Sequence, residues 1–322
     1  MLKKRSFASN NLKILPTLTF KSEQIAPEKI IFMHVPKTGG TNLHYLAQAL
    51  EYTGKKDFYY YRFAVPRKEN VSPCLLYPGW RGGLDTIEAT NPLMCATFNF
   101  ISGHFPFDLN ALPWNNFKFI TLIRNPIDRA LSLTNFDIQR GYIGKSDALN
   151  YALKCEIDNP QTRAIAGAEW MFGICTQETL DRAKSNIENY FMLAGVTEDT
   201  NGFMQVLASI LRWKPCAIVQ SQVTAEKVLP TFPDDVVKSL KEKYKYDLEL
   251  YTWVKERWEA WKARNIVEVN FIPYDLKLMC ITHEFASTRE PVFMDQEEIM
   301  KHNNHCEKEY SPIQQIENSQ DV

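Results

Sequence analysis

The chain has 322 residues, of which 45% are hydrophobic and 23% are charged, and its formal net charge is −1. This length and composition can bury a sizeable core, as one large domain or as one domain with appendages. The near-zero charge gives no electrostatic case for binding nucleic acid or an anionic membrane surface, so any basic patch must be local.

The cysteines and the first residues indicate the compartment. Seven cysteines are scattered along the chain without a CxxC pair or a Cys/His spacing that suits zinc. This pattern predicts reduced thiols in the cytoplasm, no disulfide and no metal. No stretch is apolar for long enough to be a signal peptide or a membrane span. We expect residues 1–28 to form a loosely held arm.

Residues 29–50 predict a strand, a glycine loop and a helix. A buried apolar run is followed by PKTGGT at positions 36–41 and then by leucines and alanine at helical spacing. A helix that starts after a glycine loop offers unpaired N–H groups and a positive dipole end to an anion, and Lys37, Thr38 and Thr41 add donors. Lys37 precedes both glycines, so the loop is not a Walker A loop. An ordinary helix start with an incidental surface lysine remains the alternative.

Residues 52–92 form a long irregular segment rich in glycine, proline and aromatic residues. Long irregular segments in compact domains often carry function. Our hypothesis is that this segment is an acceptor-binding wall, with Arg62, Arg67 and Arg81 as contacts for an anionic or sugar substrate. The alternative is an insertion packed by its own aromatic residues.

The next apolar stretch, residues 96–102, predicts a second strand that ends in GHFPF at positions 103–107. His104 then lies just beyond a strand end. Ligands of open α/β sheets bind outside the carboxyl ends of the strands, so His104 can face the site. A purely structural histidine is the alternative.

Residues 117–132 repeat the strand-to-helix pattern. The strand ends before Arg124, Asn125 suits the N-cap of a helix, and Pro126 suits its first position. Arg124 supplies a fork of donors and Ser132, two turns into the helix, supplies a hydroxyl. A second phosphate could lie between them.

The remainder continues the alternation of helices and strands. Helices are predicted over residues 178–189 and 200–212, a strand over residues 191–196, and a long charged helix over residues 235–264. The chain from residue 302 is polar and is predicted to be disordered. The fold class is therefore α/β, with a P-loop-like parallel sheet flanked by helices.

Five stretches together resemble the sulfotransferase superfamily. They are PKTGGT at positions 36–41, GHFPF at 103–107, RNPIDRALS at 124–132, NPQTRAIAG at 159–167 and YFMLAGVTE at 190–198. The similarity covers residues 29–253, and the branch that it resembles most is the carbohydrate type that includes the heparan sulfate and uronyl 2-O-sulfotransferases.

The resemblance implies roles for the residues of these motifs. His104 would be the catalytic base, and Lys37 would stabilise the oxygen that leaves sulfur. Arg124 and Ser132 would hold the 3′-phosphate of 3′-phosphoadenosine 5′-phosphosulfate (PAPS), and Gln161 and Arg163 would contact the acceptor. No metal is required. The 5′-phosphosulfate would be cradled by Pro36, Lys37, Thr38, Gly39, Gly40, Thr41 and Asn42.

Two features depart from the family. Relatives often carry a histidine two positions before the catalytic one, where this chain has Ser102. They are also commonly anchored in the Golgi membrane, whereas no anchor is evident in this sequence.

The sequence thus predicts a cytoplasmic sulfotransferase domain over residues 29–264, with an extension over residues 265–322 and an undetermined oligomeric state. The expected reaction is transfer of a sulfuryl group from PAPS to a hydroxyl of a carbohydrate or glycosylated small molecule. A nucleotide-dependent phosphotransferase and a non-catalytic nucleotide-binding protein are the alternatives. Against the phosphotransferase stand the position of the lysine and the lack of an obvious Mg²⁺-binding aspartate after a strand.

Overall fold

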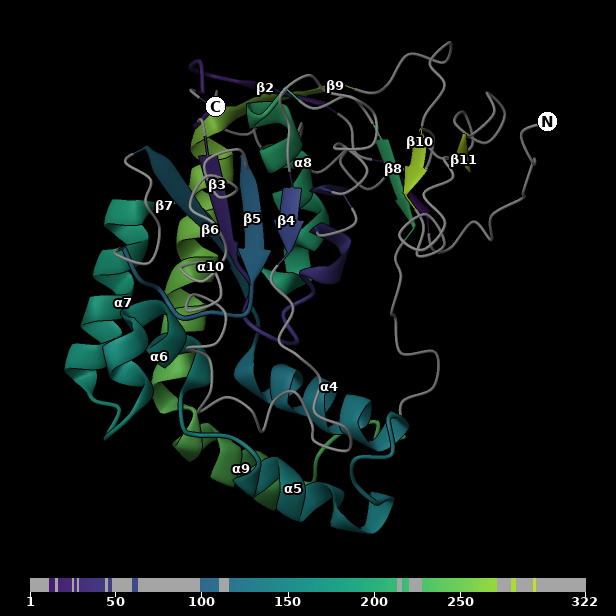
Figure 1. The fold of residues 1–322 in the computed structure, drawn as a ribbon, viewed down its shortest axis with the longest axis vertical. Helices are drawn as coiled ribbons and strands as arrows, with labels where there is room; N and C mark the ends of the chain where they lie inside the picture. Colours follow the sequence, from purple (N-terminus) through teal and green to yellow (C-terminus); the bar gives the residue numbers. More distant parts are fainter. Residues whose placement is uncertain are drawn as a thin grey trace, which may run out of the picture.

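A computed structural model describes residues 12–14, 17–24, 26–27, 29–43, 46–47, 60–62, 99–109, 116–212, 216–219, 228–270, 279–281 and 292–293. Its main feature is a five-stranded sheet in which all neighbouring strands are parallel, with the order β4-β5-β3-β6-β7 (Figure 1). The strands are β3 (Lys29–Met33), β4 (Tyr60–Arg62), β5 (Phe100–Gly103), β6 (Phe117–Ile123) and β7 (Phe191–Val196). The predicted α/β fold with a parallel sheet flanked by helices is confirmed.

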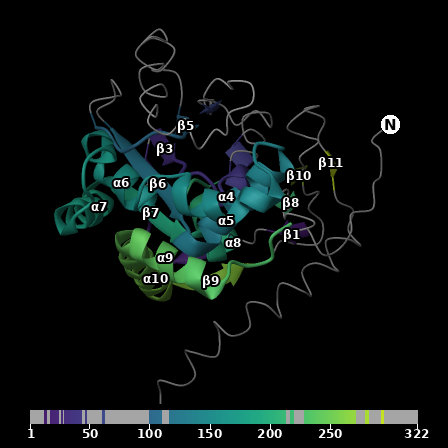
Figure 2. The same ribbon diagram turned by 90° about the horizontal axis from the view of Figure 1, so that it is seen from below.

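The helices follow the predicted alternation. In Figure 1 the strands run down toward α4, and in Figure 2, turned by 90°, α4 and α5 lie on the viewer's side of the sheet. The α-helices are α4 (Pro126–Gln139), α5 (Ala148–Lys154), α6 (Pro160–Ala166), α7 (Gln177–Tyr190), α8 (Thr200–Ile210), α9 (Asp234–Lys243) and α10 (Lys245–Asn265). Short 3₁₀ helices are η3 (Lys145–Asp147), η4 (Ala168–Met171) and η5 (Thr197–Asp199). Residues 41–43 and 46–47, after β3, are also helical.

The core lies between the sheet and the helices that pack on it. The strands form from nearly continuous apolar runs, and Ile31, Phe32 and Met33 of β3 are completely buried. Phe203 of α8 and Trp258 of α10 pack with ring centroids 5.7 Å apart, so they join two helices that both contact β7. Contacts with α8 and α10 therefore hold β7, an edge strand of the sheet, in place.

One predicted helix is wrong in detail. The charged segment over residues 235–264 is two helices, because the chain breaks at Tyr244, where the backbone leaves the helical conformation. The cause lies elsewhere in the chain, since Oδ1 of Asn159 accepts from the N–H groups of Tyr246 and Asp247 at 2.8 Å and 3.0 Å. Asn159 therefore acts as an N-cap for α10 from outside that helix.

The contact is reciprocal. Asp247, in the first turn of α10, accepts from the N–H groups of Gln161 at 3.2 Å and Thr162 at 2.7 Å, which are in the first turn of α6. Burial raises the pKa of Asp247, and these hydrogen bonds oppose that rise. The N-termini of α6 and α10 thus cap each other, which fixes the loop before α6 against α10.

Two smaller sheets join the ends of the chain. In one, β2 (Thr17–Phe20) pairs antiparallel with β9 (Ile266–Asn270), and in the other β1 (Leu12–Ile14), β8 (Cys216–Val219), β10 (Met279–Ile281) and β11 (Val292–Phe293) pair in that order. The N–H of Lys21 also donates to the carbonyl of Asn265 at 2.8 Å. The predicted loose arm therefore contains two paired strands, one of them joined to the predicted extension.

Several predictions fall outside the described residues. They are the acceptor wall apart from the strand at residues 60–62, including Arg67 and Arg81, and the polar tail from residue 302. The division into arm, domain and extension stays a prediction. In the part of the chain that the structure describes, no helix combines the length and apolarity needed to cross a bilayer.

Packing of α8 on β7 gives a test of the fold. A Cβ atom at Gly195 would lie 2.5 Å from Cδ2 of the buried Phe203 ring. Gly195→Ala therefore overpacks the core, and we expect the free energy of unfolding to fall by about 1–3 kcal/mol. Urea denaturation followed by circular dichroism measures this change.

The matched control is Gly144→Ala, where the new methyl group would meet the side-chain ends of exposed Asp147 at 3.2 Å and exposed Ser146 at 3.4 Å. The urea concentration at the midpoint of unfolding of this variant should lie within a few tenths of a molar of the midpoint of the parent. Equal loss in both variants would contradict the close approach of α8 to β7.

Candidate active site

The site forms where four strands end on the same edge of the sheet. In the strand order β4-β5-β3-β6-β7, the central strand β3 is the first of the five in the chain. The chain continues to β4 and β5 on one side of β3 and then crosses to β6 and β7 on the other side, so β3 is the topological switch point. Open α/β sheets bind ligands in the crevice at such a point. The PKTGGT loop follows β3, His104 follows β5, Arg124 follows β6 and Thr197 follows β7.

The loop after β3 has a conformation that few residues adopt. Lys37 and Gly39 have φ angles of 68° and 80°, both in the left-handed region. A non-glycine residue there costs energy and is uncommon outside functional sites. The hydroxyl of buried Thr38 donates to the carbonyl of Val35 at 2.7 Å, which closes the turn. A Cβ at Gly40 would lie 2.6 Å from Nε2 of His34, so a side chain does not fit there.

Three consecutive carbonyls of the loop are held by side chains from other elements. Arg129 donates to the carbonyl of Pro36 at 3.3 Å, and Arg124 donates to that of Lys37 at 3.2 Å. The hydroxyl of Thr197 lies 2.8 Å from the carbonyl of Thr38 and donates to it. In a trans peptide each N–H points opposite the preceding C=O. The N–H groups of residues 37–39 therefore point away from these partners. Successive backbone N–H groups in a turn of this kind can form an anion-binding site.

The imidazole of His104 has a defined orientation. Its Nδ1 lies 2.7 Å from the backbone carbonyl of His34, the residue between β3 and the loop. A carbonyl only accepts, so Nδ1 carries the proton and Nε2 of the neutral ring carries the lone pair. This is the tautomer that a general base needs if the proton is to be taken at Nε2.

A second histidine lies beside His104 in the fold, although the residue two positions before His104 in the sequence is Ser102. Ser102 is completely buried in β5, whereas His34, from the neighbouring strand, lies beside His104 with ring centroids 4.5 Å apart. The parallel register that pairs Met33 with Gly103 causes this, because the two histidines are the next residues along each strand. His34 also stacks on Phe32 at 5.2 Å.

Arg124 is fixed through its backbone. Gln161, buried at the start of α6, accepts from the N–H of Arg124 at 3.0 Å and donates to its carbonyl at 2.9 Å. Asn125 caps α4 by accepting from the N–H of Ile127 at 3.0 Å. Burial lowers the pKa of the Arg124 guanidinium, and Asp128 opposes this effect. The arginine remains protonated at neutral pH because its pKa starts so high.

Lys37 and Ser132 approach the same face of α4. The Nζ of Lys37 lies 4.1 Å from the centroid of the Phe136 ring, within range of a cation–π contact. Phe136 is four residues after Ser132 and therefore one turn further along the same helix face. The ammonium group of Lys37 therefore lies at the helix face that also carries Ser132. Thr41 and Asn42 lie in the helical start after the loop and are half-buried.

The two predicted acceptor contacts, Gln161 and Arg163, are buried and hydrogen-bonded within the protein. Arg163 is 2% exposed, and its guanidinium donates to the carbonyls of Trp170 at 2.8 Å and Gly173 at 2.9 Å and pairs with Asp158 at 2.7 Å. Gln161 is used by the backbone of Arg124. These contacts occupy both side chains within the protein, and a role for either of them in acceptor binding stays a prediction. Gln161 is a positioning residue for Arg124.

A buried ion pair lies beneath the loop. Arg129 and Glu156 form it with side chains only 1% and 2% exposed, and the hydroxyl of Tyr244 donates to the same carboxylate oxygen at 3.4 Å. Burial by itself lowers the pKa of Arg129, but the adjacent carboxylate outweighs it, so the pKa is raised. The guanidinium stays charged, and its other end holds the carbonyl of Pro36.

Sequence reasoning missed three residues that build the site. Thr197 stands directly after a strand, which is the signal that singled out His104, so the same argument could have found it. Arg129 lies inside the RNPIDRALS motif, but nothing local shows that it is buried. His34 lies two residues before Pro36 of the PKTGGT loop, yet its proximity to His104 depends on strand pairing that sequence spacing does not reveal.

A comparison with solved structures gives a weak likeness. No protein-family model matches the chain, and no curated protein matches it. Among solved structures, the chain is similar to a sulfotransferase from Alicyclobacillus acidocaldarius, with 14% sequence identity and a TM-score of 0.39, over 73% of this chain and 100% of that one. A likeness of this size does not establish a family, so the functional argument rests on the geometry of the site.

Among the described residues, no group of three or more His, Cys, Asp or Glu side chains is arranged to hold a metal ion.

The buried pair beneath the loop gives a stability prediction. Arg129→Met leaves Glu156 buried without its partner, so the free energy of unfolding should fall by about 3–5 kcal/mol, as measured by urea denaturation. The double variant Arg129→Met/Glu156→Leu removes both charges and should recover part of that loss. Arg212→Gln, which breaks an exposed pair with Glu23, should leave the melting temperature nearly unchanged. A double variant no more stable than the single one would contradict this account.

Proposed function

We propose that this chain is a sulfotransferase that moves a sulfuryl group from PAPS to an acceptor hydroxyl. The observation that carries the proposal is the meeting of three features at the switch point of a parallel sheet. These are an anion-binding turn that contains Lys37, a histidine whose tautomer is fixed at 2.7 Å by His34, and an arginine 3.2 Å from the turn. Sulfuryl transfer needs an anion cradle, a base and positive charge near the leaving oxygen.

The residues at the loop fit the donor. PAPS supplies an activated sulfuryl group at its 5′ end and a separate 3′-phosphate. The N–H groups of residues 37–39, together with Thr41 and Asn42 at the helical start, suit the 5′ end. Arg124 and Ser132 suit the 3′-phosphate, since the arginine lies against the loop and the serine faces the same side of α4 as Phe136.

His104 is the base in this proposal. The acceptor hydroxyl gives its proton to Nε2 while its oxygen forms a bond to sulfur. The positive charge that then develops on the ring is stabilised by the carbonyl of His34, which accepts from Nδ1 at 2.7 Å. Because that carbonyl belongs to the residue before the loop, the base and the anion cradle keep a constant relation to each other.

Lys37 balances the charge on the other side of the reaction. As the bond from sulfur to the phosphate oxygen breaks, negative charge gathers on that oxygen, and the ammonium group stabilises it. The Nζ of Lys37 lies 4.1 Å from the centroid of the Phe136 ring, which places the ammonium group at the face of α4.

The finer features of the proposal are the acceptor and the location. We propose a carbohydrate or a glycosylated small molecule as acceptor, on the likeness of the motifs to the carbohydrate branch. We also propose a cytoplasmic location, since the cysteines are unpatterned and the described Cys155 and Cys175 are free thiols. The alternatives, a nucleotide-dependent phosphotransferase and a non-catalytic nucleotide-binding protein, are separated by the experiments below.

Ligand-induced stabilisation tests the donor site. At about 100 times its dissociation constant, a ligand adds roughly 2.7 kcal/mol to the free energy of unfolding. We expect 3′-phosphoadenosine 5′-phosphate to raise the melting temperature of the parent protein, and Arg124→Ala to abolish that shift. Stabilisation by ATP with Mg²⁺ alone would instead indicate the phosphotransferase.

Substitution of the base tests catalysis. His104→Asn keeps an N–H donor for the carbonyl of His34 but has no basic nitrogen, so turnover should fall by about 10²–10⁴-fold. Affinity for 3′-phosphoadenosine 5′-phosphate, measured by calorimetry, should stay close to that of the parent, whereas Arg124→Ala should mainly lose this affinity. If His104→Asn turned over at the parental rate, the base would be misassigned, and if the parent itself had no turnover, the non-catalytic alternative would be favoured.

A further inference from the structure

The turn between η4 and α7 exposes apolar side chains. Phe172 and Ile174 are 57% and 86% exposed, and they are the two most exposed large hydrophobic side chains in the part of the chain that the structure describes. Met171 and Cys175, on either side of them, are buried. We call residues 172–174 the apolar turn. Single exposed apolar side chains are ordinary, whereas large ones that follow each other in one turn suggest an interaction surface.

The apolar turn has a fixed conformation. The guanidinium of buried Arg163 donates to the carbonyls of Trp170 at 2.8 Å and Gly173 at 2.9 Å. It also donates to the carbonyl of Phe172 at 3.4 Å. Because the backbone is held at these points, burial of the turn by a partner costs less ordering than burial of a loose loop would. Phe172 and Ile174 therefore suit the role of preorganised anchor residues at an interface.

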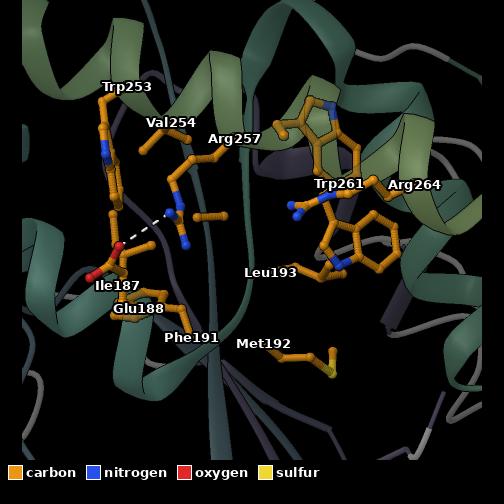
Figure 3. A pocket seen from close by; sticks show the side chains of 12 residues that line it. Ile187, Glu188, Phe191, Met192, Leu193, Trp253, Val254, Arg257, Trp261 and Arg264 are labelled. Atoms are coloured by element: carbon orange, nitrogen blue, oxygen red, sulfur yellow. Dashed lines mark ion pairs between the residues drawn. The ribbon is translucent and has the colours of Figure 1, made fainter.

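A small hollow at the amino end of β7 is lined by aromatic side chains. It has a volume of about 220 Å³ and lies between the last turn of α7, residues 191–194 of β7 and one face of α10 (Figure 3). Figure 3 shows Trp253 and Trp261 on two sides of it, with the pair of Arg257 and Glu188 beside Trp253. Pockets for drug-sized ligands measure about 300–1,000 Å³, so this hollow suits one or two side chains. Its indoles offer apolar faces to such side chains.

The charges around the two surfaces are opposite. Arg257 and Glu188 pair at 3.1 Å in the lining of the hollow, and Arg264 adds one more positive charge to it. The apolar turn, in contrast, is flanked within residues 168–182 by three exposed carboxylates and one exposed cation. They are Glu169, Glu178 and Asp181 against Arg182. Complementary charge of this kind steers two protein surfaces together and fixes their register.

The two surfaces cannot meet within one molecule. The apolar turn lies just before the start of α7, whereas Ile187 and Glu188, which line the hollow, belong to the last turn of the same helix. A helix of 14 residues is about 21 Å long. The turn of one copy can therefore reach only the hollow of another copy. A contact between two different patches is heterologous, so it repeats head to tail in a ring or a chain.

We infer that copies of this chain associate head to tail, with Phe172 and Ile174 of one copy in the hollow of the next and the carboxylates beside the turn facing Arg264. A bilayer suits the turn less well, because anionic lipids repel those carboxylates. The inference does not rest on the proposed sulfotransferase activity, since neither surface includes the loop of residues 36–41, His104 or Arg124.

Sedimentation equilibrium of the full chain tests this inference. The turn variant is Phe172→Ser/Ile174→Ser, and the hollow variant is Trp253→Ser/Arg264→Glu, which removes one indole and reverses the excess charge. We expect the mean mass of the parent to rise with protein concentration and each variant by itself to sediment at the monomer mass. An equimolar mixture of the two variants should sediment as a dimer, because each supplies the surface that the other lacks. Such rescue requires a heterologous contact and also shows that both variants are folded.

Val267→Ser is the matched control, since Val267 is 53% exposed on β9 and belongs to neither surface. This variant should associate like the parent. A parent at the monomer mass over the whole concentration range, association of either double variant by itself, or loss of association in Val267→Ser would each overturn the inference. A mixture that stays monomeric although both variants melt cooperatively would do the same. A monomeric parent that floats with phosphatidylcholine vesicles, beside a turn variant that does not, would assign the turn to a bilayer instead.

Discussion

The buried guanidinium of Arg129 is the contact on which the site depends. One end of it pairs with Glu156 away from water, and the other holds the carbonyl of Pro36, the first residue of the loop. Removing two charges from water is costly, so such a pair persists where its geometry is fixed by the surrounding packing. Here that packing comes from α4, the segment before α6, and Tyr244 at the junction of α9 and α10. The loop conformation is thus coupled to α4 and to the junction of α9 and α10.

The position of His104 is also coupled to the loop of residues 36–41, through the carbonyl of His34. The carbonyl of His34 accepts from His104, and the loop begins two residues later, with carbonyls that accept from Arg129, Arg124 and Thr197. A shift of the loop would therefore move the hydrogen-bond acceptor of His104, the proposed base. Positioning of this kind keeps reacting groups within the small tolerances that catalysis requires. Gln161 has a comparable role, because it fixes Arg124 through the backbone and leaves its guanidinium directed at the loop.

The two ends of the sheet have different chemistry. At the carboxyl ends of the strands, backbone N–H groups and a few cations converge, which suits compact anions. At the amino end of β7, indoles and arginines of α10 line a small hollow. Trp258 links the two regions, since its indole N–H donates to Asp199 at 2.7 Å, two residues after Thr197. The helix α10 therefore contributes to both ends while its buried face remains part of the core.

The sequence by itself determined the order of strands and helices, the PKTGGT turn, and the candidates Lys37, His104 and Arg124, because these depend on local apolar runs, glycine conformation and capping residues. It could not determine which side chains become buried. Arg163 has the residue type of a substrate contact, yet the fold uses its donors for carbonyls of the following loop. The tertiary structure also decided that His34 lies beside His104. The physical reason is that parallel strands are paired by register over long sequence separations, and no local pattern specifies which residues meet at the sheet edge.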